Sequence, residues 1–185
     1  MHYLFTTQVY QGKISFDLKD LKEEIKAIQK ADHDGQKWSK QNYPNGCTSY
    51  GSSRAGFDRL HRLSSTFEQL QKKINTHVQK YIKALNYDCD TKQLSMTNFW
   101  VNVMPPGAQH TAHIHPNSVI SGTFYVDIPK GASAIKFEDP RFGFFMNTPD
   151  LKGTTEPQQK RFFSLQPKAG DVVLFESWLR HEVLS

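Results

Sequence analysis

The spacing of the apolar residues changes near residue 90, and this change constrains the fold more than any other feature of the sequence. Before it, apolar side chains recur every three to four residues, as in an α-helix. After Tyr87 they alternate, as in a β-strand. The segments that join the later strands all contain Pro, and most of them contain Gly. None of them holds a convincing crossover helix. Strands without crossovers pair antiparallel, so an α+β fold with a sandwich or jelly roll is expected.

Helices are predicted in the N-terminal half. An apolar stripe over residues 18–28 follows Asp17, whose carboxylate can accept the free N–H groups of a helix start. A second stripe runs over residues 60–85. The Ser-x-x-Glu pattern that begins at Ser65 resembles a capping box, so we expect a short helix before it and a long helix from Ser65 to the region of Asn86.

Residues 31–56 lie between these stripes and are rich in Asp, Asn, Gly, Ser and Pro, which predicts a long loop. Such a loop is often functional in a compact domain, and we expect it to act as a lid. A chain of 185 residues is long enough for one domain with a real core, so a single domain over 1–185 is expected. Strands are predicted at residues 94–104, 119–128, 134–138, 161–166 and 171–176.

Composition excludes several classes of protein. With 37% hydrophobic and 22% charged residues, the chain is typical of globular proteins in water, and we expect a cytoplasmic location because no secretion signal or membrane span is recognisable. The net charge of +5 is spread along helices and interrupted by carboxylates, so there is no strong nucleic-acid signal. Cys47 and Cys89 lack Cys-x-x-Cys spacing and are expected to be free thiols.

Histidines are the candidate ligands for a metal. His110, His113 and His115 fall within six residues, and His181 follows the last predicted strand. Alternate residues of a strand face one side, so the imidazoles of His113 and His115 can face one point. Two ligands from one strand and a third from a distant strand describe the facial triad of non-haem Fe(II) enzymes. A polar strand face without a metal is the alternative.

Three segments together resemble a known family. They are HIHPNSVISGTFYV at 113–126, FEDPR at 137–141 and PKAGDVVLFESWLRH at 167–181. They resemble the 2-oxoglutarate/Fe(II)-dependent oxygenases related to prolyl hydroxylases, from Trp100 onward. The resemblance implies a double-stranded β-helix, a cupin-like jelly roll, braced here by N-terminal helices. It also implies a dioxygenase that uses Fe(II) and 2-oxoglutarate to hydroxylate a substrate. Residues 1–90 would then be mainly helical support, and residues 91–185 the metal-binding core.

The resemblance implies a ligand set. His113 corresponds to the first iron ligand and His181 to the distal histidine, while His115 occupies the place of the Asp in the His-x-Asp motif of better-known relatives. An imidazole in place of an Asp leaves the site one charge more positive. Either three histidines hold the metal, or a carboxylate from Glu138 or Asp139 completes the site. His110 could also replace His113, although its offset places it off the strand face.

The resemblance also concerns the cosubstrate. Tyr125 falls where the prolyl hydroxylase branch uses a tyrosine to bind 2-oxoglutarate, and a core aromatic residue is the alternative. Asn102 is a weaker candidate for a pocket residue. The family binds the far carboxylate with an Arg or Lys, often on the strand after the distal histidine. The basic residues on or near strands do not match that position; they are Lys136, Arg141 and Arg161.

Only four residues follow His181, which is too few for another strand. We therefore expect the functional chain to continue beyond Ser185 with an Arg and a strand. The missing Arg and the His-for-Asp replacement also favour an alternative, a cupin-like metal-binding protein without oxygenase activity, either an isomerase or a binding module. The substrate, a small molecule or a peptide, and the oligomeric state are not defined by the sequence.

Overall fold

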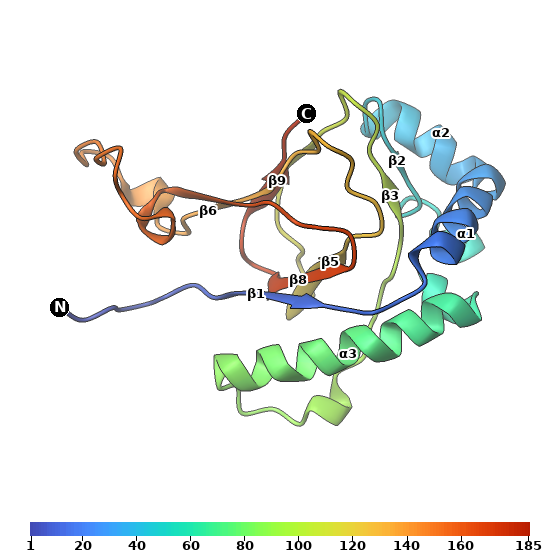
Figure 1. Ribbon diagram of the computed structural model, residues 1–185, viewed down its shortest axis with the longest axis horizontal. Coiled ribbons are helices and arrows are strands. Elements are labelled where there is room, and N and C mark those ends of the chain that lie inside the picture. The colour runs from blue at the N-terminus through green and yellow to red at the C-terminus, as the bar shows by residue number, and fades with distance from the viewer.

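The computed structural model describes residues 1–185 as a mixed α/β protein with three α-helices (Figure 1). The helices are α1 (Leu18–Ala31), α2 (His33–Asn42) and α3 (Ser65–Leu85). The strands are β1 (Val9–Lys13), β2 (Cys47–Thr48), β3 (Asn102–Val103), β4 (His110–His113), β5 (Ile120–Phe124), β6 (Ile135–Glu138), β7 (Phe162–Leu165), β8 (Asp171–Glu176) and β9 (His181–Val183).

The strands form three antiparallel sheets, as expected from the short connections. One sheet has the order β1-β8-β5, another the order β4-β9-β6-β7, and β2 pairs with β3. The antiparallel α/β architecture is compatible with a 2-oxoglutarate oxygenase fold. Closure of the sheets into a jelly roll remains a prediction.

Strand β8 is the centre of the core because its two faces pack against different elements. Val172 and Leu174 belong to the cluster that contains the buried side of α3. Val173 and Phe175 face the other way and pack with Ile135 and Phe137 of β6. The three-stranded sheet therefore lies between α3 on one side and the four-stranded sheet on the other, and Figure 1 shows α3 running beneath β1 and β8.

The helix ends agree with the sequence analysis except for one cap. The Asp17 carboxylate accepts hydrogen bonds from the backbone N–H groups of Lys19 and Asp20 at the start of α1. Helix α3 begins at Ser65 as predicted, but the capping side chain is Ser64, one residue earlier. The C-terminal cap of α3 is Asn86, with a left-handed φ of 57°.

Three expectations about secondary structure were wrong. Residues 33–42, expected within a long loop, form α2, because the buried carboxylate of Asp32 caps this helix and accepts a hydrogen bond from the Gly35 N–H. Residues 9–13, in the half expected to be mainly helical support, form β1, which gains its stability from pairing with β8. Within residues 94–104, only Asn102 and Val103 form a strand.

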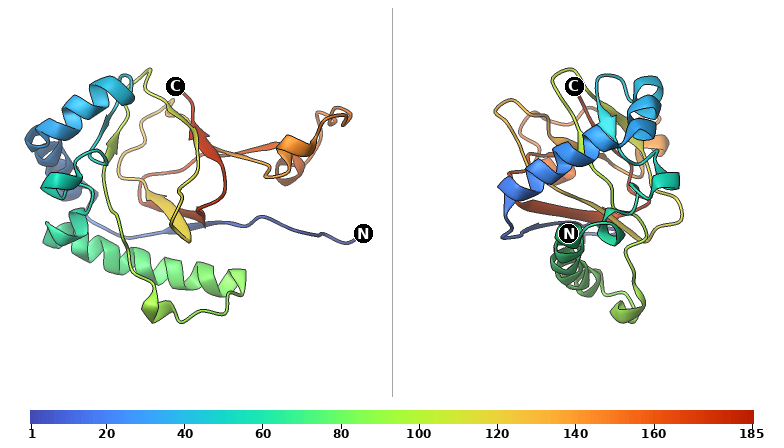
Figure 2. Two further views of the ribbon diagram at one scale, coloured as in Figure 1. Left: turned by 180° about the vertical axis from the view of Figure 1, so that it is seen from behind. Right: turned by 90° about the vertical axis from the view of Figure 1, so that its right-hand side faces the viewer.

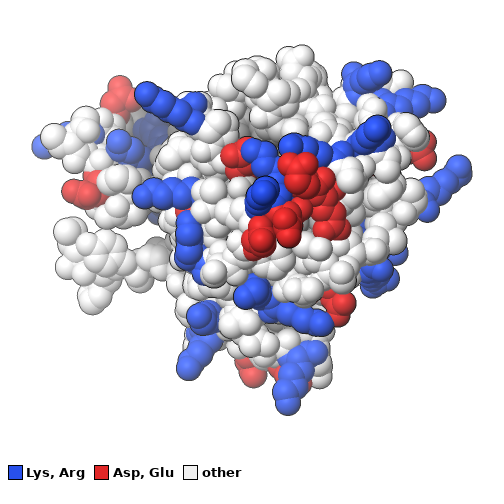
Figure 3. Space-filling model, turned by 45° about the vertical axis from the view of Figure 1, so that its right-hand side comes forward, with Lys and Arg blue, Asp and Glu red and all other residues white.

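Two segments project from the body on the same side, the residues before β1 and the connection between β6 and β7 (Figures 1 and 2). On the face drawn in Figure 3, Lys and Arg side chains are scattered, and acidic side chains gather among them near the middle. None of the helices has both the length and the apolar character that a bilayer span requires.

The packing of β8 against α3 gives a stability prediction. Leu174 is 2% exposed, so Leu174→Ala should lower the free energy of unfolding by about 2–5 kcal/mol, through lost apolar burial and the cavity left behind. Urea denaturation measures this loss. The matched control Leu151→Ala, at a residue that is 47% exposed, should change the value by less than about 0.5 kcal/mol. Equal effects of the two substitutions would contradict the assigned core.

Candidate metal centre

Three histidine side chains converge on one point. One ring nitrogen each of His113, His115 and His181 lies within 4.8 Å of the other two. The Nε2 atoms of His113 and His115 are 3.0 Å apart, and the His113 and His181 ring centroids are 4.4 Å apart. The structure thus brings together the three histidines that the sequence analysis selected as metal ligands.

Strand pairing positions these rings. His113 ends β4 and is the direct partner of His181 in β9, so the two side chains lie on the same face of the sheet. His115 lies beyond the end of β4, and its place is fixed by the hydrogen bond from its backbone N–H to the Ser177 carbonyl, 2.9 Å long. Simple alternation along one strand, assumed in the sequence analysis, is therefore only part of the reason for the convergence.

His110 lies closer to the group than expected. The pairing of β4 with β9 shifts register between His110 and His113, and this irregularity stacks the two rings with centroids 4.4 Å apart. The His110 ring also packs near Tyr43, with a centroid distance of 5.1 Å. His110 is a neighbour of the histidine group and is not one of its three members.

Each of the three histidines has a hydrogen-bond partner for its Nδ1 atom. The Nδ1 atom of His113 lies 2.7 Å from the Thr111 carbonyl, and that of His181 lies 2.9 Å from the Leu179 carbonyl. The Nδ1 atom of His115 lies 2.7 Å from the Ser121 hydroxyl. These partners fix the ring orientations and direct the Nε2 atoms toward one another, as in metal sites where an outer partner orients each imidazole.

The surroundings favour neutral imidazoles. Burial, together with repulsion from the neighbouring histidines, lowers the pKa of His181 to about 4, although a hydrogen bond to the Leu179 backbone opposes this shift. Burial also lowers the pKa of His115 below its usual value, with a smaller contribution from His113. A neutral imidazole keeps a nitrogen lone pair for a metal, so the site is ready to coordinate a cation at neutral pH.

The geometry fits a transition metal with nitrogen ligands. Two imidazole nitrogens at right angles, each about 2.1 Å from a shared ion, lie about 3.0 Å apart. This equals the separation of the His113 and His115 Nε2 atoms. Imidazole is a suitable ligand for iron, copper, nickel and zinc, whereas calcium and magnesium prefer oxygen. The donor set of this site therefore fits Fe(II).

Comparison with known proteins assigns the C-terminal half of the chain. Residues 98–185 match the family described as "Putative 2OG-Fe(II) oxygenase". This part of the chain is therefore similar to the 2OG-Fe(II) oxygenases. The matched segment contains all three converging histidines, and the family implies Fe(II) and 2-oxoglutarate as cofactor and cosubstrate. No curated protein matches the sequence of the chain.

The two carboxylates considered as additional ligands are engaged elsewhere. Glu138 lies 3.5 Å from the Arg180 guanidinium, and its neighbour in the strand, Phe137, is the residue that faces the core. Asp139 accepts two hydrogen bonds from the Arg141 guanidinium and one from the Arg141 backbone N–H, and these hold the pKa of this carboxyl below its usual value. Neither residue belongs to the converging group.

The two residues predicted around the cosubstrate lie in different surroundings. Tyr125 follows β5 and packs against the cluster that contains Phe137 and Phe175, both of which contact the ring of His181. Burial raises the pKa of the Tyr125 hydroxyl to about 12. Asn102 is exposed in β3, where its backbone pairs with Thr48. The predicted roles of both residues remain predictions.

The basic residues considered for the far carboxylate are paired with other groups. Lys136 forms a 2.8 Å ion pair with Glu182. The neighbours of these two residues along their strands face inward, so the side chains of Lys136 and Glu182 lie on the outer face of the sheet. Arg141 binds Asp139, and Arg161 donates to the carbonyls of residues 148 and 149. Lys136, mentioned in the sequence analysis as a basic residue near a strand, therefore points away from the histidines.

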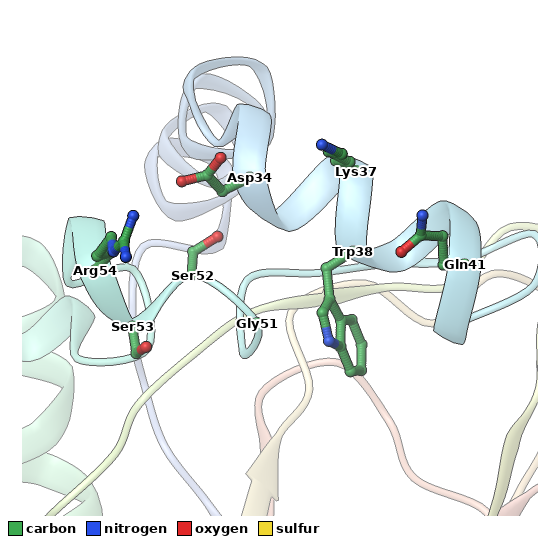
Figure 4. Close-up of a pocket in the computed structure, with 8 residues that line it drawn as sticks. All are labelled: Asp34, Lys37, Trp38, Gln41, Gly51, Ser52, Ser53 and Arg54. Atoms are coloured by element: carbon green, nitrogen blue, oxygen red, sulfur yellow. The ribbon is translucent and has the colours of Figure 1, made fainter.

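The sequence analysis missed the aromatic residues beside the site. The Trp100 ring meets His115 edge-on at 6.2 Å, and Tyr50 packs on Trp100 with a centroid distance of 5.0 Å. Tyr50 belongs to the segment predicted as a lid, so this segment packs on Trp100, the aromatic residue next to His115. A polar cavity of about 310 Å³ lies on the outside of the same segment, between α2 and residues 51–54, and Figure 4 shows Trp38 beside it.

The geometry predicts a metal-binding phenotype. Purified protein should bind one Fe(II), or one Co(II), Ni(II) or Zn(II) in its place. The double substitution His113→Ala/His181→Ala removes two ligands, so it should weaken binding by more than the roughly 10–100-fold that loss of an outer partner costs. Isothermal titration with Co(II) measures the affinity.

The control for this measurement is the double substitution His2→Ala/His33→Ala, which also removes two histidines but at exposed positions. This control should bind Co(II) as the unmodified protein does. Unchanged affinity in the His113→Ala/His181→Ala protein would rule out the histidine group as the metal site.

Proposed function

We propose that the protein is a 2-oxoglutarate-dependent hydroxylase whose Fe(II) is held by His113, His115 and His181. The observation that carries the proposal is the convergence of three imidazoles within the segment that matches the oxygenase family. The three ligands come from one side, which leaves other coordination positions for cosubstrate and dioxygen. The family match does not favour the alternative of a cupin-like protein without oxygenase activity.

The chain contributes binding, orientation and exclusion of water. When bound, Fe(II) and 2-oxoglutarate supply the chemistry, which oxidises 2-oxoglutarate to succinate and carbon dioxide and adds one oxygen atom of dioxygen to a substrate C–H bond. The Thr111 and Leu179 carbonyls hold the two rings of the strand pair in position. The Phe175 ring lies 4.4 Å from the His181 ring and keeps water from the inner side of this ligand.

Tyr125 is the proposed donor to the cosubstrate. Its raised pKa means that the hydroxyl stays protonated at neutral pH and can donate a hydrogen bond to a carboxylate. Ser121 and Tyr125 are four positions apart along the same strand direction, so both side chains face the interior. Tyr125 therefore lies on the same face as Ser121, but farther from the histidines. The far end of a chelated 2-oxoglutarate would extend toward this position.

The first test of the proposed function is turnover of 2-oxoglutarate. Protein with Fe(II), ascorbate and 2-oxoglutarate should release succinate, and the His113→Ala/His181→Ala protein should release no more than iron alone. Quantification of succinate by mass spectrometry checks this. A protein that binds Fe(II) through these histidines but releases no succinate, and shows no charge-transfer band with 2-oxoglutarate under anaerobic conditions, would refute the oxygenase proposal.

A second prediction concerns the affinity for the cosubstrate. Tyr125→Phe removes one hydrogen bond to a charged group, so it should weaken 2-oxoglutarate binding by about 1.5–3 kcal/mol. The free energy of unfolding should change little because the ring remains. Anaerobic titration of the Fe(II) protein with 2-oxoglutarate measures the affinity. A large loss of stability with unchanged affinity would show that Tyr125 is a structural core residue.

A further inference from the structure

Two segments that project from the body carry apolar side chains that the rest of the protein leaves uncovered. They are residues 1–8, here called the N-terminal arm, and residues 139–161 between β6 and β7, here called the β6–β7 arm. Both leave the body on the same side (Figures 1 and 2). Five large apolar side chains on these arms are between 68% and 93% exposed: Tyr3, Leu4, Phe5, Phe144 and Met146. Large apolar side chains grouped on an exposed surface mark an interaction site.

The β6–β7 arm is held together by interactions within it. The guanidinium carbons of Arg141 and Arg161 lie 5.8 Å and 5.7 Å from the centre of the Phe145 ring. Phe145 is half-buried by these contacts, whereas Phe144 and Met146 on either side of it are exposed. The arm therefore presents two apolar side chains from an ordered segment, and a surface that is ordered in advance loses less entropy on binding.

The N-terminal arm is tied to the body at its base. The Tyr81 hydroxyl of α3 donates a 2.7 Å hydrogen bond to the Gln8 carbonyl, and β1 begins at the next residue. Residues 1–8 contain no Asp, Glu, Lys or Arg, and three exposed apolar residues follow one another at positions 3–5. Water solvates such a sequence poorly, so this arm gains from contact with another apolar surface.

The apolar area of the arms is large enough for a stable protein interface. A large aromatic side chain buries about 150–250 Å² when it is covered, so the five exposed residues together offer on the order of 800 Å². Stable interfaces bury about 800 Å² on each partner. The two arms of one chain therefore supply the area that one side of such an interface requires.

We propose that the two arms join two copies of this chain into a dimer with twofold symmetry. Because both arms leave the body on the same side, a second copy turned by 180° presents the same apolar side chains to them, and each patch covers the other. Homodimer interfaces are more apolar than other protein interfaces, in agreement with the lack of charged side chains in the N-terminal arm. The dimer does not depend on the metal centre or on the proposed function.

A lipid surface is the other apolar environment that projecting side chains can meet, but the charge of the arms disfavours it. Surfaces that bind membranes combine apolar side chains with an excess of Lys and Arg, which attract anionic lipids. The β6–β7 arm contains four basic and three acidic residues, and the N-terminal arm contains neither. This near balance of charge favours a second copy of the chain over a membrane.

The oligomeric state of the full chain tests the proposal. Light scattering coupled to size-exclusion chromatography should give twice the 21.3 kDa of one chain. Interfaces of this area have dissociation constants in the micromolar range or tighter, so the dimer should predominate at about 100 μM. Phe144→Ser and Phe5→Ser, one in each arm, should each weaken dimerisation by about tenfold or more, because each removes an aromatic ring from the interface. Sedimentation equilibrium measures the dissociation constants.

The control is Leu63→Ser, which removes a 55% exposed apolar side chain from the body and should leave the dimer unchanged. A monomer at about 100 μM, or a dimer with the same dissociation constant in both arm variants, would overturn the proposal. If one arm variant does not fold, the other decides. Flotation with phosphatidylcholine and phosphatidylserine vesicles tests the alternative, since a monomer that binds vesicles, and loses this binding in Phe144→Ser, would show a membrane surface instead.

The dimer and the proposed function are tested separately. The His113→Ala/His181→Ala protein should dimerise with the affinity of the unmodified chain, because neither residue belongs to an arm. A dimer that releases no succinate would leave this inference intact and count only against the oxygenase proposal. A folded His113→Ala/His181→Ala protein that is monomeric would contradict the assignment of the interface to the arms.

Discussion

The antiparallel pairing of β4 with β9 is the interaction on which the metal centre depends. It places His113 directly opposite His181, although the two are 68 positions apart in the sequence. Strand β9 also pairs with β6, and Phe137 of β6 packs on Phe175 of β8. The ligands are therefore tied to the core of the protein, and a change in the packing of β8 would be transmitted to the ring of His181 through Phe175.

Neutrality of the ligand set is the second constraint. Burial and repulsion from neighbouring histidines lower the pKa of His115 and of His181, which favours the uncharged form of these two rings. In the proposed site, three histidine ligands would provide no protein carboxylate to balance the two positive charges of Fe(II). A 2-oxoglutarate dianion would bring two negative charges, so charge balance would come from the cosubstrate. The orientation of His115 depends on the Ser121 hydroxyl beside its Nδ1 atom and on the Ser177 carbonyl, which accepts a hydrogen bond from its backbone N–H.

The sequence defined the parts of the structure that follow from local rules. The start of α1 behind Asp17, the end of α3 at Asn86 and the position of β8 follow from caps and periodicity. Helix α2 has few apolar residues and depends on a buried cap, Asp32, so its pattern resembles a loop. Strand β1 depends on pairing with a segment about 160 residues away, which local patterns do not reveal.

The same distinction applies to the site. The three histidines were recognisable because their residue type and spacing suit a metal. Ser121 and Ser177 were not, since serines are common and only the tertiary fold brings them to His115. Trp100 and Tyr50 reach the site through packing between distant segments. The irregularity that stacks His110 on His113 also arises from strand pairing and has no counterpart in the local sequence.

The central claim is that three imidazoles, and no carboxylate, hold the metal through their Nε2 atoms. Proton NMR of the Co(II)-substituted protein tests it most directly, because each coordinated imidazole with a protonated Nδ1 gives one strongly shifted resonance that exchanges with deuterium oxide. The account predicts three such resonances, from His113, His115 and His181. Two resonances, with the third position filled by a carboxylate such as that of Glu138, would contradict it.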